Sequence, residues 1–215
     1  MEGLEQLSAT LALTMGVAWA SGINLYAAIV TLGLLSYGEQ IHLPPNLDIV
    51  ANPWVIGAAG LMYVIEFFAD KIPGVDTAWD GIHTFIRIPA GALLAAAAVG
   101  DISPAMEVAA GIVGGGLATG THATKAGTRV LINTSPEPFT NWGASIGEDV
   151  TVIGGIWLCL NQPVLFLALL VVFILFMIWL LPKIWTGIKK VFRFIFNLFG
   201  GHSSDEEHSS TPPPR

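Results

Sequence analysis

Charged residues are scarce in this chain. Of its 215 residues, 12% are Asp, Glu, Lys or Arg, whereas 53% are hydrophobic. A soluble domain carries about a quarter charged residues, so this composition indicates a membrane protein. The formal net charge of −7 argues against nucleic acid as a partner, because phosphate binding needs a basic surface.

Cysteine and the common catalytic motifs are also lacking. The single Cys159 lies in an apolar run, so no intramolecular disulfide can form, and we interpret this thiol as a small buried hydrophobe. The sequence contains no G-x-S-x-G elbow, Walker loop, H-E-x-x-H or C-x-x-C motif. We therefore expect no catalytic residue, no metal site and no cofactor.

Long apolar runs take the place of charge. About 20 residues cross the hydrocarbon core of a bilayer. The runs predict an all-α fold with about six transmembrane helices inside a transmembrane domain over residues 7–182. The predicted spans are residues 7–35, 53–68, 76–99, 105–124, 135–160 and 164–181. The second with the third, and the fourth with the fifth, suggest two repeated helical hairpins.

The first apolar run is long for a single span and is interrupted by polar and small residues at Ser21, Gly22 and Asn24. We prefer one tilted, broken helix, and two short half-helices are the alternative. Such a break can line a binding site, as in transporters with discontinuous helices, or form a notch for helix packing.

The chain after Pro182 changes character. Residues 183–199 alternate basic and aromatic side chains, which predicts an amphipathic helix lying in the membrane interface. Residues 200–215 are rich in Ser, Pro and acidic residues, so we expect a disordered cytoplasmic tail.

The basic residues are distributed unevenly along the chain. None of the nine Lys and Arg residues falls at 36–52, 101–104 or 161–163, the three loops that the six-span topology puts on one side. The positive-inside rule makes the opposite side cytoplasmic. Six spans then put both termini in the cytoplasm.

Several ionisable residues fall within the predicted spans when about 20 residues are counted inward from the outer helix ends. Each costs a few kcal/mol or more in the bilayer centre unless it is paired or hydrated. The sequence therefore predicts a polar cluster or cavity open to the cytoplasm. Its candidate members are Glu66, Asp70, Asp80, His83, Arg87, His122, Lys125, Arg129, Glu148 and Asp149, with Lys125 and Arg129 just beyond the boundary.

Each candidate also has a structural interpretation. Glu66 is either a coupling carboxylate or half of an ion pair that fixes helix packing. His83 and His122 are proton relays or satisfied structural histidines. Lys125 and Arg129 either bind an anion near a helix start capped by Ser135 or anchor the interface. Adjacent Glu148 and Asp149 point to different sectors of a helix, so they do not form a hydrolytic dyad.

Three stretches carry a family resemblance. They read E-F-F-A-D-K-I-P-G-V-D-T-A-W-D-G-I-H-T-F-I-R-I-P-A-G-A-L-L at 66–94, G-T-H-A-T-K-A-G-T-R at 120–129 and N-T-S-P-E-P-F-T-N at 133–141. With these motifs the chain resembles a family of small bacterial integral membrane proteins known only as a domain of unknown function. The resemblance implies a multi-pass protein of the bacterial cytoplasmic membrane and supplies no reaction or substrate.

Three functional hypotheses follow. The first is a small transporter or channel-like permease, an oligomer in the lipid bilayer, for a small ion or an anionic solute. Glu66 or Glu148 would be its coupling carboxylate, with Arg87, Lys125 and Arg129 as counter-charges. The second is a non-transporting membrane scaffold. The third and weakest is an intramembrane enzyme acting on lipid with His83 or His122 as base.

Overall fold

The computed structural model describes residues 2–72, 74–100, 102–134 and 138–200. Every regular element in these ranges is a helix, so the predicted all-α fold is confirmed. The elements are α1 (Glu2–Tyr37), a short 3-10 helix η1 (Asp48–Ala51), α2 (Pro53–Ala69), α3 (Val75–Val99), α4 (Pro104–Ile132), α5 (Pro138–Asn161) and α6 (Pro163–Gly200).

Two helices begin with the same capping chemistry. The side chain of Asn52 accepts a hydrogen bond from the Trp54 amide at 2.9 Å, and that of Ser103 accepts one from the Met106 amide at 3.3 Å. In both helices proline is the first residue, where its missing N–H costs nothing. The cap predicted at Ser135 lies outside the described residues.

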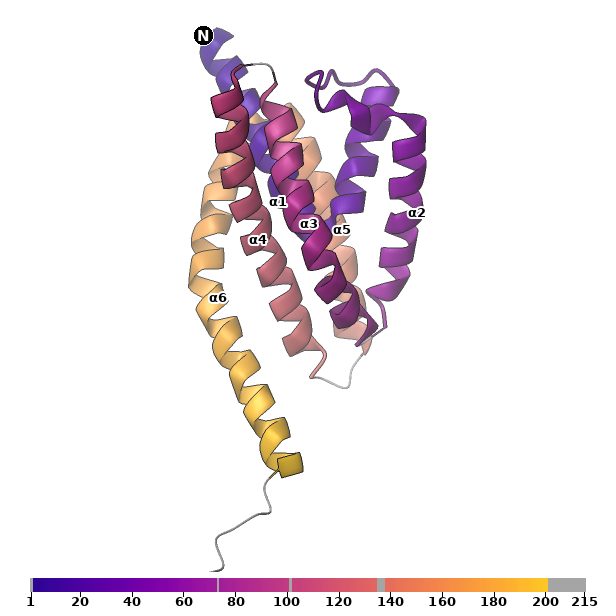
Figure 1. Cartoon of the computed structure of the whole chain (residues 1–215), viewed down its shortest axis with the longest axis vertical. Coiled ribbons are helices and arrows are strands. Elements are labelled where there is room, and N and C mark those ends of the chain that lie inside the picture. The colour runs from indigo at the N-terminus through magenta and orange to yellow at the C-terminus, as the bar shows by residue number, and fades with distance from the viewer. Residues whose placement is uncertain (1, 73, 101, 135–137, 201–215) are drawn as a thin grey trace, which may run out of the picture.

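Helix α1 doubles back on itself. Asn24 has non-helical backbone angles (φ −146°, ψ 96°), which confirms the predicted break. Before the break, Gly16 packs against Cys159 near the end of α5. After it, Gly33 packs against Val50 just before α2 begins. Both arms of α1 therefore reach the same end of the bundle, and the helix forms a V instead of a single crossing (Figure 1).

The tip of this V lies deep inside the bundle. Nδ2 of Asn24 donates a hydrogen bond to Oδ1 of Asp149 at 2.9 Å. Asp149 precedes the end of α5 at Asn161 by 12 residues, or about 18 Å at 1.5 Å per residue. That depth is more than half of a hydrocarbon core of about 30 Å. The alternative of two half-helices thus describes α1 better than one tilted span.

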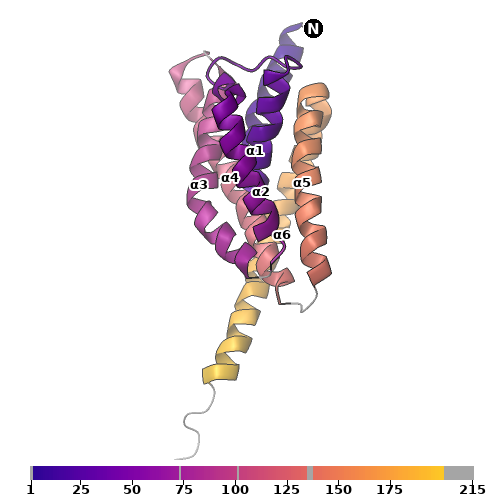
Figure 2. The same ribbon diagram turned by 90° about the vertical axis from the view of Figure 1, so that its right-hand side faces the viewer.

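Helices α2 to α6 run the length of the bundle in alternating directions (Figures 1 and 2). Among the described helices, α1, α3, α5 and α6 are long and apolar enough to cross a membrane, while α2 is apolar but has 17 residues. Helix α1 meets this criterion of length and composition, but it turns back at Asn24 and does not run straight along the bundle.

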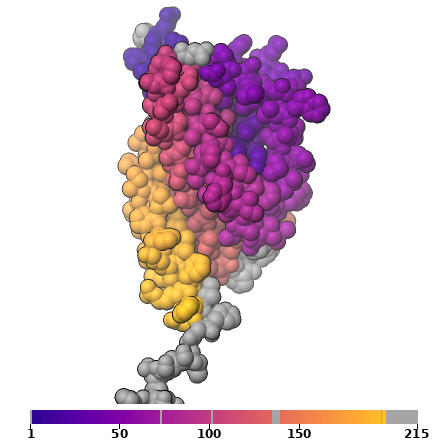
Figure 3. Space-filling view, in the orientation of Figure 1, coloured from indigo at the N-terminus to yellow at the C-terminus, as the bar shows by residue number. Residues whose placement is uncertain are grey.

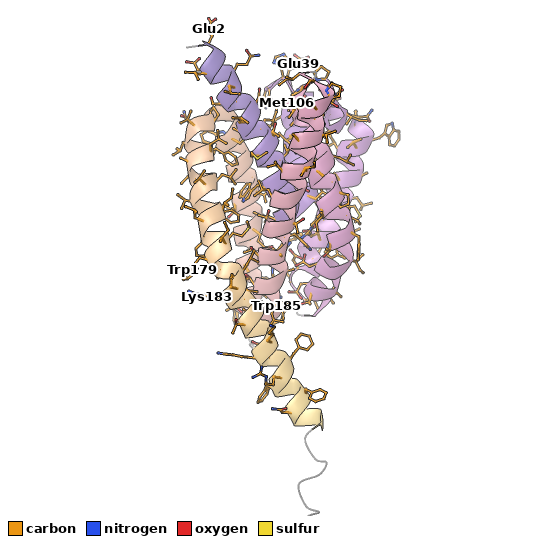
Figure 4. All side chains as sticks on the ribbon, turned by 60° about the vertical axis from the view of Figure 1, so that its left-hand side comes forward. Glu2, Glu39, Met106, Trp179, Lys183 and Trp185 are labelled. Carbon is orange, nitrogen blue, oxygen red and sulfur yellow. The ribbon has the colours of Figure 1, made fainter. Side chains whose placement is uncertain are left out.

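The start of α1 at Glu2 and the end of α6 at Gly200 lie at opposite ends of the bundle. Figure 4 shows Glu2 and Glu39 at one end, and Lys183 toward the other. We call these the Glu39 end and the basic end. The V of α1 means that α1 does not count as one crossing, so the side of each terminus stays a prediction.

The core of the bundle is built around α1, which contacts all five other α-helices. Small residues make this close packing possible. A Cβ on Gly22 would lie 2.6 Å from the carbonyl oxygen of Ala118, and one on Gly91 would clash with the Cβ of Ala118. Glycine-rich α4 packs closely on α1 and α3, but α1 holds the centre.

The predicted hairpins form antiparallel pairs whose arms lie apart. Helix α3 packs extensively on α4, whereas α2 scarcely touches α3 and α4 scarcely touches α5. The internal repeat stays a prediction. The amphipathic segment after Pro182 is not a separate helix, because α6 continues through this proline to Gly200. The predicted tail lies beyond the described residues.

The V of α1 can be tested by cysteine accessibility in a Cys159→Ala parent. We expect Glu5→Cys and Gln40→Cys to react with a membrane-impermeant maleimide from the same side, and Lys190→Cys to react only from the other. Gln40→Cys is the matched control, because its loop lies between α1 and η1. Labelling of the Glu5 and Lys190 positions from one side would instead mean that α1 crosses the membrane.

Packing at the tip predicts a glycine-specific effect. Gly22→Ala should lower the free energy of unfolding by about 1–3 kcal/mol, because the new methyl group overlaps Ala118 and Thr121. The control is Gly57→Ala in α2, where a Cβ meets nothing within 4 Å and alanine should be neutral or slightly stabilising. Detergent unfolding monitored by circular dichroism measures both, and equal effects would contradict the packing at the tip.

Candidate functional site: a buried charge network

Three basic side chains lie at the centre of a charge network inside the bundle. Arg87 comes from α3, and Lys125 and Arg129 come from one face of α4, one turn apart. All three are buried, with 0%, 6% and 1% of their surface exposed. Charges so far from water persist only with close partners, so their neighbours define the site.

Arg87 joins α3 to α2. Its Nη2 pairs with Oε1 of Glu66, and its Nη1 donates to Oδ1 of Asp80 at 3.0 Å. Asp80 and Arg87 are seven residues apart on α3, a spacing of two helical turns that puts them on one face. Glu66 is fully buried, so the predicted ion pair of this carboxylate is present in the structure.

Lys125 is the hub of the network. Its Nζ lies 3.2 Å from Oε1 of Glu66, 3.3 Å from Oδ2 of Asp70, 3.2 Å from Oε2 of Glu148 and 3.7 Å from Oδ1 of Asp80. One ammonium thus contacts carboxylates from three helices. Glu66 and Asp70 lie in and directly after α2, Asp80 lies in α3, and Glu148 lies in α5. The interpretation of Lys125 as an interfacial anchor is wrong, because its charge is enclosed by protein.

Arg129 ties α4 to α5. Its Nε and Nη2 donate to the two carboxylate oxygens of Glu148 at 3.0 and 2.8 Å, a bidentate pair. Its Nη1 donates to the backbone oxygen of Asp70 at 3.2 Å and to the side chain of Asn141. These four hydrogen bonds of one guanidinium connect α4, α5 and the end of α2. Nothing in the sequence pattern singled out Asn141.

His122 contacts this network as a neutral side chain. Oγ1 of Thr84 donates to the backbone oxygen of Asp80 at 2.9 Å, so it accepts from Nε2 of His122 at 2.7 Å. Nδ1 of His122 then faces Nη1 of Arg87 at 3.4 Å, where only an acceptor fits the guanidinium donor. His122 therefore adds no positive charge to the site.

His83 faces α1 instead of the ion pairs. Its Nδ1 donates to the backbone oxygen of Trp79 at 2.9 Å, and its Nε2 lies 3.1 Å from the hydroxyl of Tyr26. The imidazole also stacks on Trp79, with ring centroids 4.2 Å apart. Both nitrogens are satisfied, and the ring links α3 to the second arm of α1. Sequence reasoning did not identify Tyr26 as its partner.

The tip of α1 touches the network at two points. Oγ of Ser21 donates to the backbone oxygen of Arg87 at 3.0 Å. Asn24 bonds Asp149 through Nδ2, and its Oδ1 accepts from the amide of Ala27 at 3.0 Å, which caps the second arm of α1. The Asp149 carboxylate thus lies near the start of a helix, where the dipole favours negative charge.

The charges in the network do not balance. Four carboxylates, Glu66, Asp70, Asp80 and Glu148, surround the three bases. Three buried oxygens, Oε2 of Glu66, Oδ1 of Asp70 and Oδ2 of Asp80, have no hydrogen-bond partner. Since an isolated negative charge is costly away from water, the site fits one further positive charge, a proton or a small cation. Asp149, held by uncharged Asn24, adds to the excess.

The predicted candidates gather at this site with different roles. Seven of them form the ion-pair network: Glu66, Asp70, Asp80, Arg87, Lys125, Arg129 and Glu148. His122 and Asp149 lie at its edge, and His83 bonds α1. Among the described residues, no three His, Cys, Asp or Glu side chains are arranged to hold a metal ion.

A neighbouring contact closes the network toward the basic end. Nδ2 of Asn133 donates to both carboxylate oxygens of Asp76, at 2.7 and 2.9 Å, and Asp76 also accepts from the amide of Gly74. Asp76 is fully buried and pins the α2–α3 turn against the end of α4. Sequence reasoning did not predict this role.

Comparison with known proteins gives one match. The model of a protein family described as "Domain of unknown function (DUF4126)" matches residues 11–183, which include every residue of the network. No curated protein and no solved structure matches the chain.

The ion pairs predict a sharp stability effect. Arg87→Gln should lower the free energy of unfolding by about 3–5 kcal/mol, because it leaves the Glu66 and Asp80 carboxylates buried without their partner. Adding Glu66→Gln should recover part of this loss, which a double-mutant cycle in detergent measures. The control Lys190→Gln, at an exposed position of α6, should change stability by less than about 0.5 kcal/mol. Additive losses in the double variant would contradict the pairing.

Proposed function

We propose that this chain, which belongs to the DUF4126 family of unknown function, is a small membrane transporter or channel-like permease for a proton or a small monovalent cation. The buried charge network is its ion-binding site, and the tip of α1 is the segment that separates this site from the Glu39 end. The proposal rests on the charge imbalance of the network and on the broken helix beside it.

In this proposal the membrane surrounds the bundle along its long axis. Helices α2 to α6 cross it, and α1 enters from the Glu39 end and returns to it. Lys71, Lys125 and Arg129 and the basic residues of α6 belong to the opposite half, which the positive-inside rule makes cytoplasmic. The end of α6 is then cytoplasmic and the start of α1 is on the outer side of a bacterial cytoplasmic membrane.

The charge imbalance carries the proposal. A packing device needs no more than matched pairs, and a protein gains nothing in stability from an extra buried carboxylate. This network has one carboxylate more than its bases and three unpartnered carboxylate oxygens at its centre. An ionisable group inside the membrane that stays unmatched is a functional candidate by default, and reversible uptake of one positive charge is the function it fits.

The V of α1 favours ion transport rather than ion binding without transport. Non-helical backbone at membrane depth occurs where protein or a water-filled path surrounds it. Asn24 stands at such a break, and Ser21 and Asn24 bond groups of α3 and α5 next to the network. Discontinuous helices meeting a charged site are a recurring architecture of ion-coupled transporters.

The ion is a cation in this proposal and not the anionic solute also considered from the sequence. Arg87, Lys125 and Arg129 are each engaged by at least two carboxylates, so each positive charge is already paired, although Nε of Arg87 has no hydrogen-bond partner. The enzyme hypothesis loses support from the histidines, because His83 and His122 are both held by hydrogen bonds within the protein.

Reconstitution into proteoliposomes tests the proposal. With a trapped pH-sensitive dye and an imposed membrane potential, the parent protein should conduct protons, or with a Na⁺- or K⁺-sensitive dye it should conduct that ion. Glu66→Gln should reduce this flux at least about tenfold, because removing the most buried carboxylate removes the excess negative charge.

Two further variants make the result interpretable. Glu5→Gln neutralises an exposed carboxylate near the start of α1 and should leave flux unchanged. Asp70→Asn neutralises a network carboxylate while leaving the Arg87 pairs intact, so it should also reduce flux if Glu66→Gln disturbs folding. If the parent protein is well folded but conducts none of these ions, the transport proposal is wrong and the scaffold hypothesis is favoured.

A further inference from the structure

The last part of α6 extends beyond the rest of the bundle. Its contacts with α4 include Met177 against Gly120, Ile184 against Gly127 and Gly187 against Leu131. Helix α4 itself ends at Ile132. Past this point α6 projects from the basic end (Figures 1 and 3). We call residues 183–197 the α6 extension.

The length of α6 places this extension outside the hydrocarbon core. The helix has 38 residues, which span about 57 Å at 1.5 Å per residue. A core of about 30 Å is crossed by about 20 residues, so a span that begins at Pro163 leaves the core near Pro182. The α6 extension therefore lies at or below the headgroups of the same membrane face.

The extension has two chemically different faces. At about 100° per residue, Trp185, Phe192 and Phe196 fall within about 40° of one another, and their side chains are 59%, 66% and 74% exposed. Lys189 lies beside them, about 20° from Phe196, and Arg193 and Lys190 follow at about 60° and 120° from Phe196. Phe194, which is 67% exposed, lies on the side of Lys190 and faces away from the other three aromatic residues. A row of exposed aromatic side chains favours a surface that covers it.

The basic and aromatic residues are already arranged as at a membrane interface. Nζ of Lys183 lies 3.1 Å from the ring centroid of Trp179, and Nζ of Lys189 lies 5.2 Å from that of Trp185. Figure 4 shows Trp179, Lys183 and Trp185 where α6 leaves the bundle. Tryptophan rings and lysine side chains that extend toward water are the anchors that helices use at headgroup level.

We propose that the α6 extension binds the anionic phospholipid surface of the membrane that α6 crosses. Phe192 and Phe196 enter the boundary between headgroups and acyl chains, while Lys189, Lys190 and Arg193 contact lipid phosphates. Since α6 is a continuous helix in the structure, this placement requires it to bend onto the surface beyond Gly187, which still packs against Leu131 of α4. This inference is independent of the ion-binding proposal, because it involves no residue of the charge network.

Charge and continuity select lipid over a second copy of the chain. The exposed charged residues of the extension are Lys183, Lys189, Lys190 and Arg193, all of one sign, so two parallel extensions in an oligomer would repel one another. A headgroup layer of phosphates, by contrast, attracts each basic residue by about 1 kcal/mol, and it lies next to the extension wherever α6 spans the membrane.

Spin labels at two positions two residues apart test the inference. In full-length Cys159→Ala protein in lipid nanodiscs, labels are placed at Phe192→Cys and at the matched control Phe194→Cys, about 200° away around the helix. With phosphatidylglycerol mixed into phosphatidylcholine, the label at 192 should be several-fold more accessible to oxygen than to a water-soluble nickel complex. The label at 194 should show the opposite preference.

The electrostatic part is tested by removing charge from either partner. Nanodiscs of phosphatidylcholine alone, or the variant with Lys189→Gln, Lys190→Gln and Arg193→Gln, should reduce the difference between the two labels several-fold. Equal nickel accessibility at 192 and 194 in anionic nanodiscs would overturn the proposal, as would protection of 192 accompanied by a short distance between labels on two copies. Folding of each variant is checked by its elution in detergent.

Discussion

The contact on which this structure depends is that of the Lys125 ammonium with carboxylates from several helices. Its Nζ lies within 3.3 Å of Glu66, Asp70 and Glu148, which belong to or adjoin α2 and α5. In lipid there is little hydrophobic gain from bringing apolar helices together, so specific polar contacts decide which helices associate. The charge network thus acts as the common attachment point for helices that otherwise touch only sparsely, such as α2 with α3 and α4 with α5.

The same network explains why α1 is bent. A helix crossing the centre of this bundle would run through the space of Arg87 and Lys125. The chain instead stops at Asn24, satisfies the interrupted backbone with its own side chain and with Asp149, and returns. Ser21 completes the junction by bonding the Arg87 backbone. The break in α1 and the charges of α2 to α5 are therefore one structural feature and not two.

The sequence predicted the members of this site better than the path of the chain. Depth counting from the outer helix ends found the ten ionisable residues, because hydrophobic runs and capped starts such as Ser103-Pro104 fix where a helix begins. It ended the fourth helix near Thr124, whereas α4 continues past Gly127 to Ile132 and keeps Lys125 and Arg129 buried within the protein. Asn141 and Tyr26 were missed because a single polar or aromatic residue in an apolar helix carries no pattern.

The V of α1 shows why counting apolar runs is a weak guide to topology. The polar residues Ser21 and Asn24 indicate that α1 is interrupted. The angle between its two arms depends on the tertiary contacts of these residues with Arg87 and Asp149, which lie far along the chain. The side assigned to the N-terminus followed only from counting crossings, so one miscounted span reverses it. The side assigned to α6 rests on the basic residues themselves and does not change. Charge placement is thus the stronger guide to orientation, and span counting is the weaker one wherever a helix carries a polar break at membrane depth.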